Sequence, residues 1–309
     1  MDRDTCWVLT GPTASGKTAL SIRLAKEHEC EIICMDSMQI YRGMNIGTAK
    51  PTPVEMDGIA HHMLDVADPD EPFSVARYQE MAEACIEDIL SRGKHVLFVG
   101  GTGLYLRALR QPMAMGEVSG DDTLRGELEA LAMEDGGRQQ LHDMLEAVDP
   151  VTAARLHLND VRRVVRALEV FKLTGVPFSQ QKQIESPSRY NYRVASLTMD
   201  RALLYSRIEK RVDLMVEQGL IEEVRNLLLN GVPADCQAMK AIGYKEIVPF
   251  VLGESTWEEA DYLLKLNTRH YAKRQLTWMR REPDVLWVDS MQADAYDRLE
   301  NWYTQGEGL

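Results

Sequence analysis

The chain has 309 residues, of which 45% are hydrophobic and 27% are charged. This composition is typical of a globular protein and excludes a collagen-like, disordered or disulfide-scaffold chain, and the length fits two domains of about 150 residues or one large α/β domain. The net charge of −13, from 35 Lys and Arg against 48 Asp and Glu, disfavours a nucleic-acid partner only as an average.

The first hundred residues alternate short apolar runs with helix-like stretches. Apolar runs at 5–10, 31–35 and 95–99 predict strands, whereas 17–28 and 75–90 have helical spacing. Strands that alternate with helices predict a parallel sheet with right-handed crossovers.

The pattern changes beyond about residue 110. Residues 121–183 are charged and helix-like without a convincing strand, and strand-like residues return at 192–199. Helical stretches at 201–218, 220–230 and 256–281 and a short strand at 285–288 follow. Because strands return after a purely helical segment, we expect an α/β core interrupted by an all-helical insertion: core at 1–110, insertion at 111–190, core again at 191–309.

The basic residues are unevenly distributed. From Glu117 to Asp149 ten acidic residues stand against two arginines, whereas Arg155–Arg193 holds eight Lys or Arg against three acids and Lys265–Glu282 holds six against one. A polyanion binder needs a basic face and not a basic average.

Cysteine and histidine usage gives no metal signature. The five cysteines are Cys6, Cys30, Cys34, Cys85 and Cys236, and the Cys30–Cys34 pair has no second Cys or His pair at zinc spacing. We expect free thiols, and we expect the adjacent His61 and His62 to make structural hydrogen bonds.

The N-terminus lacks a basic segment followed by an apolar stretch, and no apolar run approaches the roughly 18 residues that span a bilayer. We expect a cytoplasmic protein without a membrane partner.

The clearest motif follows the first predicted strand. Gly11-Pro12-Thr13-Ala14-Ser15-Gly16-Lys17-Thr18 fits G-x-x-x-x-G-K-[ST] and precedes a helix. In such a loop the backbone N–H groups and the lysine bind phosphates, and the threonine hydroxyl binds Mg²⁺. We therefore expect a P-loop NTPase-like core that binds a phosphate chain and Mg²⁺.

Asp36 follows the second predicted strand and permits two interpretations. It could bridge magnesium in an ATPase or small-molecule kinase, or it could activate an acceptor in a transferase. No Asn-Lys-x-Asp signature is present, and the third strand ends in Gly100-Gly101-Thr102-Gly103 instead of an acid.

Further segments carry a family resemblance. They are Gly11–Thr18, Asp36–Arg42 continuing into Gly47–Pro51, His61–Asp65, Gly100–Tyr105, Asn159–Glu169, Ala241–Glu246 and Ala272–Trp278. Together they resemble the bacterial tRNA dimethylallyltransferases (isopentenyl-tRNA or IPP transferases), in family order and nearly end to end, with the weakest match at 110–150.

The resemblance implies transfer of a dimethylallyl group from dimethylallyl diphosphate to N6 of adenosine 37 in the tRNA anticodon stem-loop, with release of diphosphate. It implies that Asp36 is the general base, that Lys17 and the loop hold the diphosphate, and that Thr102 contacts the reacting adenosine. It also assigns tRNA contacts to Asp36, Ser37, Met38, Gln39, Thr102, Arg125, Arg162, Arg163, Val164, Val165 and Arg166.

Residues 160–174 predict a helix, with Asp160 as its cap and Gly175 as its stop. Arg162 and Arg166 lie one turn apart on it. By itself this pattern is typical of a solvated basic face, whereas the resemblance makes it a tRNA surface.

Arg207 and Arg211 are also one turn apart, and we expect Arg211 to reach the diphosphate. Two other functions remain open, a P-loop ATP-dependent small-molecule kinase and a non-catalytic RNA-binding protein. The kinase has no use for an arginine-rich helical insertion, and the RNA-binding protein has no role for Asp36. We expect the enzyme to act as a monomer.

Overall fold

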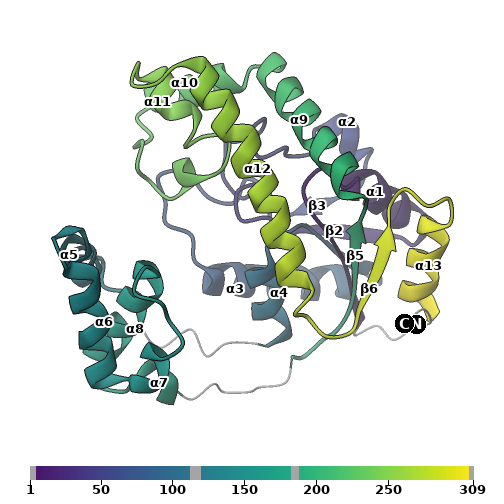
Figure 1. Cartoon of the computed structure of the whole chain (residues 1–309). Coiled ribbons are helices and arrows are strands. Elements are labelled where there is room, and N and C mark those ends of the chain that lie inside the picture. The colour runs from purple at the N-terminus through teal and green to yellow at the C-terminus, as the bar shows by residue number, and fades with distance from the viewer. Residues whose placement is uncertain (1–4, 112–119, 182–187, 306–309) are drawn as a thin grey trace. The chain divides into compact units, whose positions relative to one another are not determined.

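A computed structural model describes residues 5–111, 120–181 and 188–305 (Figure 1). The chain divides into two compact units, one formed by Met1–Arg110 with Pro187–Leu309 and the other by Gln111–Ser186. The second boundary falls at Ser186 instead of residue 190, and Tyr190 is buried in the core of the larger unit. Within the described ranges, no helix is long and apolar enough to cross a membrane.

The larger unit contains a six-stranded parallel sheet in the order β3-β2-β4-β1-β5-β6. The first strand lies near the centre, because β1 pairs with β4 on one side and with β5 on the other. Five strands lie where the sequence predicts them, and the two-residue β3 is additional. The strands are β1 (Thr5–Thr10), β2 (Cys30–Cys34), β3 (His61–His62), β4 (His95–Val99), β5 (Asn191–Thr198) and β6 (Val285–Asp289).

Both faces of the sheet are covered, so β1 is buried along its whole length. Its side chains alternate between two cores: Cys6 and Val8 point to one, and Trp7 and Leu9 to the other. The helices α3 (Val75–Ser91) and α4 (Gly103–Arg110) contribute to the first core, and α1 (Lys17–Glu27) and α13 (Ala295–Gln305) cover the second (Figure 1).

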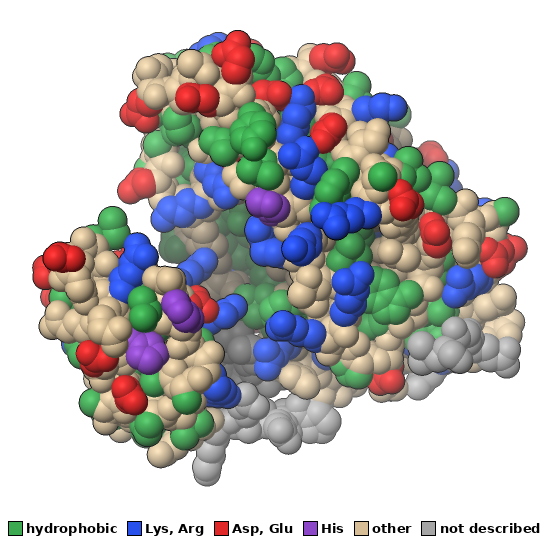
Figure 2. Space-filling view, in the orientation of Figure 1, with side chains coloured by type: hydrophobic (Ala, Val, Ile, Leu, Met, Phe, Trp, Pro, Cys, Tyr) green, Lys and Arg blue, Asp and Glu red, His purple; other side chains and the backbone are tan. Residues whose placement is uncertain are grey.

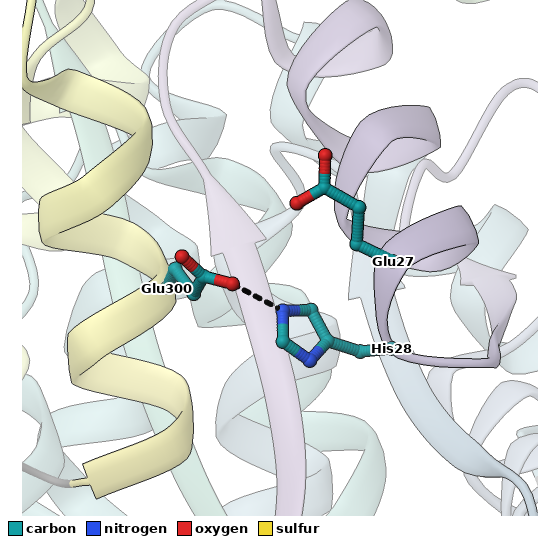
Figure 3. A group of neighbouring side chains, drawn as sticks. All are labelled: Glu27, His28 and Glu300. Carbon is teal, nitrogen blue, oxygen red and sulfur yellow. Dashed lines mark hydrogen bonds and ion pairs between the residues drawn. The ribbon is translucent and has the colours of Figure 1, made fainter.

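The C-terminal helix α13 is fastened to the sheet and to α1. The Tyr303 hydroxyl donates to the Val8 carbonyl at 2.7 Å, and the Trp302 indole donates to the Val194 carbonyl at 3.1 Å. At the end of α1, His28 Nε2 lies 2.9 Å from Glu300 Oε1, with Glu27 beside them (Figure 3). These contacts join the first and last helices of the described residues.

Further helices of the larger unit lie beyond the carboxyl ends of the strands (Figure 1). The predicted helices at 201–218, 220–230 and 256–281 are confirmed, and the longest, α12, packs on α9, α11 and α4. They are α2 (Pro53–Met56), α9 (Arg201–Glu217), α10 (Leu220–Leu229), η2 (Ala238–Lys240), α11 (Ile247–Val251) and α12 (Trp257–Met279).

The smaller unit is helical throughout its described residues and has its own core of Leu, Val and Ala side chains. Its elements are α5 (Asp122–Met133), α6 (Gly137–Val148), α7 (Pro150–Ala153), α8 (Val161–Thr174) and η1 (Phe178–Gln180). The helix α8 stops at Gly175 in the left-handed conformation, as predicted. Asp160 does not cap the helix with its side chain; it pairs with Arg163 at 2.7 Å.

The histidine and cysteine predictions are confirmed. His61 Nδ1 lies 2.9 Å from the Ile59 carbonyl oxygen, and His62 Nε2 lies 2.7 Å from Glu31 Oε2, so both rings make hydrogen bonds within the fold. All five cysteines are free thiols.

Candidate active site

The predicted phosphate loop joins β1 to α1. Gly11 and Gly16 have φ angles of 141° and 92°, and a Cβ on Gly11 would lie 2.9 Å from the Leu197 carbonyl oxygen. These backbone conformations require glycine and let the chain turn sharply into α1. The helix begins without a side-chain cap and without an acidic residue in its first turn, so its positive N-terminus is not neutralised.

The loop borders a cavity of about 1070 Å³ within the larger unit. The other walls come from the residues that follow β2 and β4, and from α9 and α12. The predicted residues Asp36, Ser37, Met38, Gln39 and Arg211 line this cavity, together with 13–18 of the loop. The carboxyl ends of adjacent parallel strands meet here, which is where α/β proteins bind ligands.

Two cations in the cavity have no anion bound to them within the described chain. Lys17 donates to the carbonyls of Gly11 and Pro12 at 3.0 and 2.8 Å. Burial and then the Arg211 charge lower its pKa to about 8, while Asp36 acts in the opposite direction. Burial also lowers the pKa of Arg211. Since like charges are held together away from water, the cavity favours an anion such as diphosphate.

Arg207 and Arg211 have different positions although they lie one turn apart on α9. Arg207 Nε donates to the Ala14 carbonyl at 2.9 Å and so holds the loop itself. Arg211 makes no hydrogen bond with any residue in the described ranges and lines the cavity. This arrangement favours Arg211 for the ligand and gives Arg207 a supporting role that the sequence did not indicate.

Asp36 stands just beyond β2. Its Oδ1 accepts hydrogen bonds from the Met38 and Gln39 amides at 2.9 and 3.4 Å. Burial raises the pKa of Asp36, while these two amides and the charges of Lys17 and Arg211 oppose that rise. A carboxylate with a raised pKa is a better proton acceptor than an ordinary one.

Thr102, for which the resemblance implied a contact with the adenosine, lies beside the segment that follows β2. Its Oγ1 accepts a hydrogen bond from the Ser37 amide at 3.0 Å, and its own amide donates to the Met35 carbonyl at 3.1 Å. The structure thus brings Asp36 and Thr102, which are far apart in the sequence, to one edge of the sheet.

Two residues of α12 belong to the site although no role was predicted for them. Gln275 accepts from the Thr13 amide at 3.0 Å and donates to the Gly101 carbonyl at 3.2 Å, so it ties the phosphate loop to the segment after β4. Tyr271 lines the cavity, and burial and Asp36 raise its pKa. Both lie in Ala272–Trp278 or next to it, and only that resemblance pointed to them.

The predicted magnesium ligand, Thr18, fits the ion. Thr18 lines the cavity that Asp36 also lines, and its hydroxyl makes no hydrogen bond with any described residue. Mg²⁺ prefers oxygen donors and is held in such sites largely through substrate phosphates. Two clusters of metal-ligand side chains lie elsewhere in the described ranges, namely Glu27–His28–Glu300 and His142–Asp143–Glu146. Glu27 already accepts from Arg23 and Tyr296, which favours a structural role for the first cluster.

The residues with predicted tRNA contacts on α8 divide into two kinds. Arg162, Arg163 and Arg166 reach the surface, whereas Val164 and Val165 are each only 1% exposed and pack in the core of the smaller unit. The two valine side chains therefore anchor the helix and do not offer a contact surface, in contrast to the sequence-based prediction.

The arginines are organised around a buried acid. Glu169 is fully buried and pairs with Arg166 at 2.6 Å and with Arg125 at 2.9 Å. Burial would raise the pKa of Glu169, but the hydrogen bonds from Arg166 and the Asp121 amide and the charge of Arg125 hold it below its usual value. Arg162 forms no ion pair with any residue that the structure describes, so its charge is available to a partner.

A second basic surface lies on the larger unit. Lys and Arg side chains gather over α9 and α12, while Asp and Glu are frequent over α10 and α11 (Figure 2). On α12, Lys265 and Arg269 pair with acids of α9. Four basic side chains at its C-terminal end are exposed without an ion pair among the described residues: Lys273, Arg274, Arg280 and Arg281.

Comparisons with known proteins point to one family. The family model described as IPP transferase matches residues 39–282. Relatives called tRNA dimethylallyltransferase include one from Carboxydothermus hydrogenoformans, 50% identical over 92% of this chain and 91% of its own, and one from Halalkalibacterium halodurans, 49% identical over 93% and 91%.

Solved structures give the same result. The full-length tRNA isopentenylpyrophosphate transferase of Bacillus halodurans is 46% identical with a TM-score of 0.72, covering 97% of this chain and 94% of its own. A eukaryotic dimethylallyltransferase acting on tRNA is 30% identical with a TM-score of 0.78, covering 97% and 76%. The chain belongs to the IPP transferase family.

Proposed function

We propose that this chain transfers a dimethylallyl group from dimethylallyl diphosphate to N6 of adenosine 37 in tRNA, forming N6-(dimethylallyl)adenosine and diphosphate. The observation that carries the proposal is the placement of Lys17, Arg211 and Asp36 around one cavity. Family membership and relatives named tRNA dimethylallyltransferase support it.

The donor's diphosphate binds where Lys17, Arg211 and the N-terminus of α1 converge. When the allylic C–O bond breaks, its electron pair leaves with the diphosphate, and negative charge grows on the departing oxygen. Fixed cations in a site shielded from water stabilise this developing charge more than they stabilise the bound donor. When bound at Thr18, Mg²⁺ supplies further charge neutralisation to the diphosphate.

Asp36 serves the acceptor. The adenine N6 amine is a weak nucleophile, so it must lose a proton as its nitrogen bonds to the allylic carbon. The unprotonated Asp36 carboxylate accepts that proton, and its Oδ1 stays oriented by the Met38 and Gln39 amides. Thr102 holds the adjoining Ser37 amide and so fixes the segment that faces the base.

The tRNA binds through basic side chains that have no acid opposite them. Arg162 on α8 supports this contact in the smaller unit, and the exposed end of α12 supports it in the larger one. Recognition of an anticodon-loop base requires that the base leave its stack, and phosphate contacts on either side stabilise such a conformation.

The test is a product analysis. The protein is incubated with unmodified tRNA and either dimethylallyl diphosphate or ATP, and the digested nucleosides are analysed by mass. We expect the prenylated adenosine in the reaction with dimethylallyl diphosphate and not in the reaction with ATP. A product formed only with ATP would overturn this proposal. Light scattering of the active protein tests the expectation of a monomer.

A further inference from the structure

Glu223, which lies outside the cavity, binds the segment 45–47, which leads into the cavity wall. Glu223, in the first turn of α10, accepts hydrogen bonds from three consecutive backbone amides. Asn45 N lies 2.9 Å from Oε2, Ile46 N lies 2.9 Å from Oε2 and 3.1 Å from Oε1, and Gly47 N lies 3.1 Å from Oε1. Successive amides that converge in this way form an anion-binding concavity, and here the anion is supplied by the protein.

Tyr244 completes the arrangement. Its hydroxyl donates to Glu223 Oε1 at 2.5 Å, and its ring packs so closely on Gly47 that a Cβ there would lie 2.5 Å from the ring. Glu223 thus receives four donors through two oxygens. Gly47 lines the cavity, whereas Glu223 and Tyr244 do not, so these two side chains hold the segment 45–47 without forming part of the cavity wall.

The residues that follow lead directly to the predicted base. The carbonyls of Thr48 and Ala49 accept hydrogen bonds from the Gln39 side-chain amide at 3.0 and 3.1 Å. The backbone amide of Gln39 donates to Asp36 Oδ1 at 3.4 Å. Hydrogen bonds, together with the backbone of the segment 45–49 and the covalent frame of Gln39, therefore connect Glu223 to Asp36.

We propose that Glu223 is a positioning residue for prenyl transfer, which holds the segment 45–49 so that Gln39 keeps the Asp36 carboxylate oriented toward the acceptor. The inference rests on the proposed function. Glu223 touches neither substrate, and its effect reaches the reacting atoms through Gln39. A shift of the segment by a fraction of an ångström weakens the longer of the two amide contacts to Asp36 first.

The experiment compares Glu223→Gln with Glu222→Gln in single-turnover prenylation of tRNA at saturating donor. Glu222 is the exposed neighbour that pairs only with Arg225 among the described residues, so its variant makes the same charge change without touching the segment. We expect Glu223→Gln to slow transfer about tenfold to a hundredfold, with little change in donor affinity. We expect Glu222→Gln to match the wild type.

The pH profile separates positioning from simple stabilisation. The hydrogen bond from the Gln39 amide favours the ionised form of Asp36. If Glu223→Gln weakens this bond, the pKa of Asp36 should rise, and the acidic limb of the rate profile should move to higher pH. An unchanged rate and profile at an intact fold would overturn the inference. If Glu223→Gln does not fold, Tyr244→Phe serves instead, because it removes only one of the four donors to Glu223. Its acidic limb should move to higher pH by a smaller amount. A Tyr244→Phe profile without this shift would overturn the inference equally.

A double-mutant cycle with Gln39→Ala gives the decisive readout. If Glu223 acts through the Gln39 side chain, Glu223→Gln should slow the Gln39→Ala protein by less than about twofold. Effects that simply multiply would show that Glu223 acts by another route. A wild-type protein without any prenyl transfer would instead refute the proposed function, so the two failures are distinguishable.

Discussion

Lys17 has a pKa of about 8, because burial and the nearby Arg211 disfavour its charged form. Diphosphate binds the ammonium form, so donor affinity should fall as the pH rises through about 8. Lys17→Ala should bind more weakly and lose this dependence. Calorimetric titration of both proteins with the donor, from about pH 7 to about pH 9.5, measures this pH dependence of donor affinity. A wild-type affinity that is constant over this range would place the diphosphate away from Lys17.

Asp36→Asn tests the general base. The amide keeps the shape of the side chain but cannot accept the proton, so the rate should fall on the order of a hundredfold or more. Binding of tRNA, measured by filter retention, should stay largely intact. An equal loss of affinity and rate would make Asp36 a binding residue and not a base.

The same substitution has a predictable effect on stability. Since burial raises the pKa of Asp36 above its value in the unfolded chain, the folded state prefers the neutral carboxyl. Its contribution to stability is complete below the unfolded pKa of about 3.9 and is lost as the pH rises through the higher folded pKa. Asp36→Asn should therefore gain melting temperature relative to wild type between about pH 4 and about pH 7, measured without substrates. A difference that does not grow with pH would contradict this reasoning.

At the scale of elements, the surface of α8 can be tested with single charges. Arg162 forms no ion pair among the described residues, so Arg162→Ala should weaken tRNA binding and reduce its salt dependence by roughly one unit of slope. Titrations at several salt concentrations measure this slope. Lys172→Ala removes the same charge from the last turn of α8 and serves as the control. Equal salt slopes of tRNA affinity for wild type and Arg162→Ala would show that Arg162 is only solvated and does not contact tRNA.

Arg166 is a less suitable probe of the same surface. It pairs with the fully buried Glu169, so its removal leaves that carboxylate with Arg125 as its remaining charged partner among those the structure describes. Loss of one partner of a buried ion pair destabilises a fold by several kcal/mol. Weak tRNA binding by Arg166→Ala would thus mix recognition with unfolding of the smaller unit.

The elements that the sequence predicted correctly are those with a local pattern. Residues 5–10 and 95–99 form strands with the expected bounds because each is a short apolar run. The edge strand β3 has only two residues and depends on pairing with β2, so no apolar run in the sequence indicated it. The helix α13 was not predicted either, although it buries Trp302 and Tyr303 on the sheet.

The site follows the same rule. The residues 11–18 and Asp36 could be predicted because a motif or a strand end marks them. Gln275 and Glu223 could not, since each acts through hydrogen bonds to backbone amides more than 170 positions away in sequence. A hydrogen bond to a backbone amide does not depend on the side chain of the residue that carries the amide. The sequence of the contacted segment therefore gives no sign of the bond.

For the whole molecule, the separate cores predict separate responses to ligand. The core of α5–α8 shares no residue with the clusters around the sheet. Inorganic diphosphate should therefore slow amide hydrogen exchange in β1, α1 and the segment after β2, and leave exchange in α5, α6 and α8 unchanged. Mass spectrometry of exchanged peptides measures both. Equal protection of the two units would show that they unfold as one.

The contact between Tyr303 and Val8 spans 295 positions of the chain. During synthesis at about 5–20 residues per second, β1 leaves the ribosome about 15 to 60 seconds before the helix that covers its second face. Its partner β5 also arrives late, after the helical insertion has been made. The phosphate loop is translated before β5 and α13, so it acquires the support of these two elements late. Truncation of the chain just before α13 should therefore abolish the site as completely as truncation just after the phosphate loop.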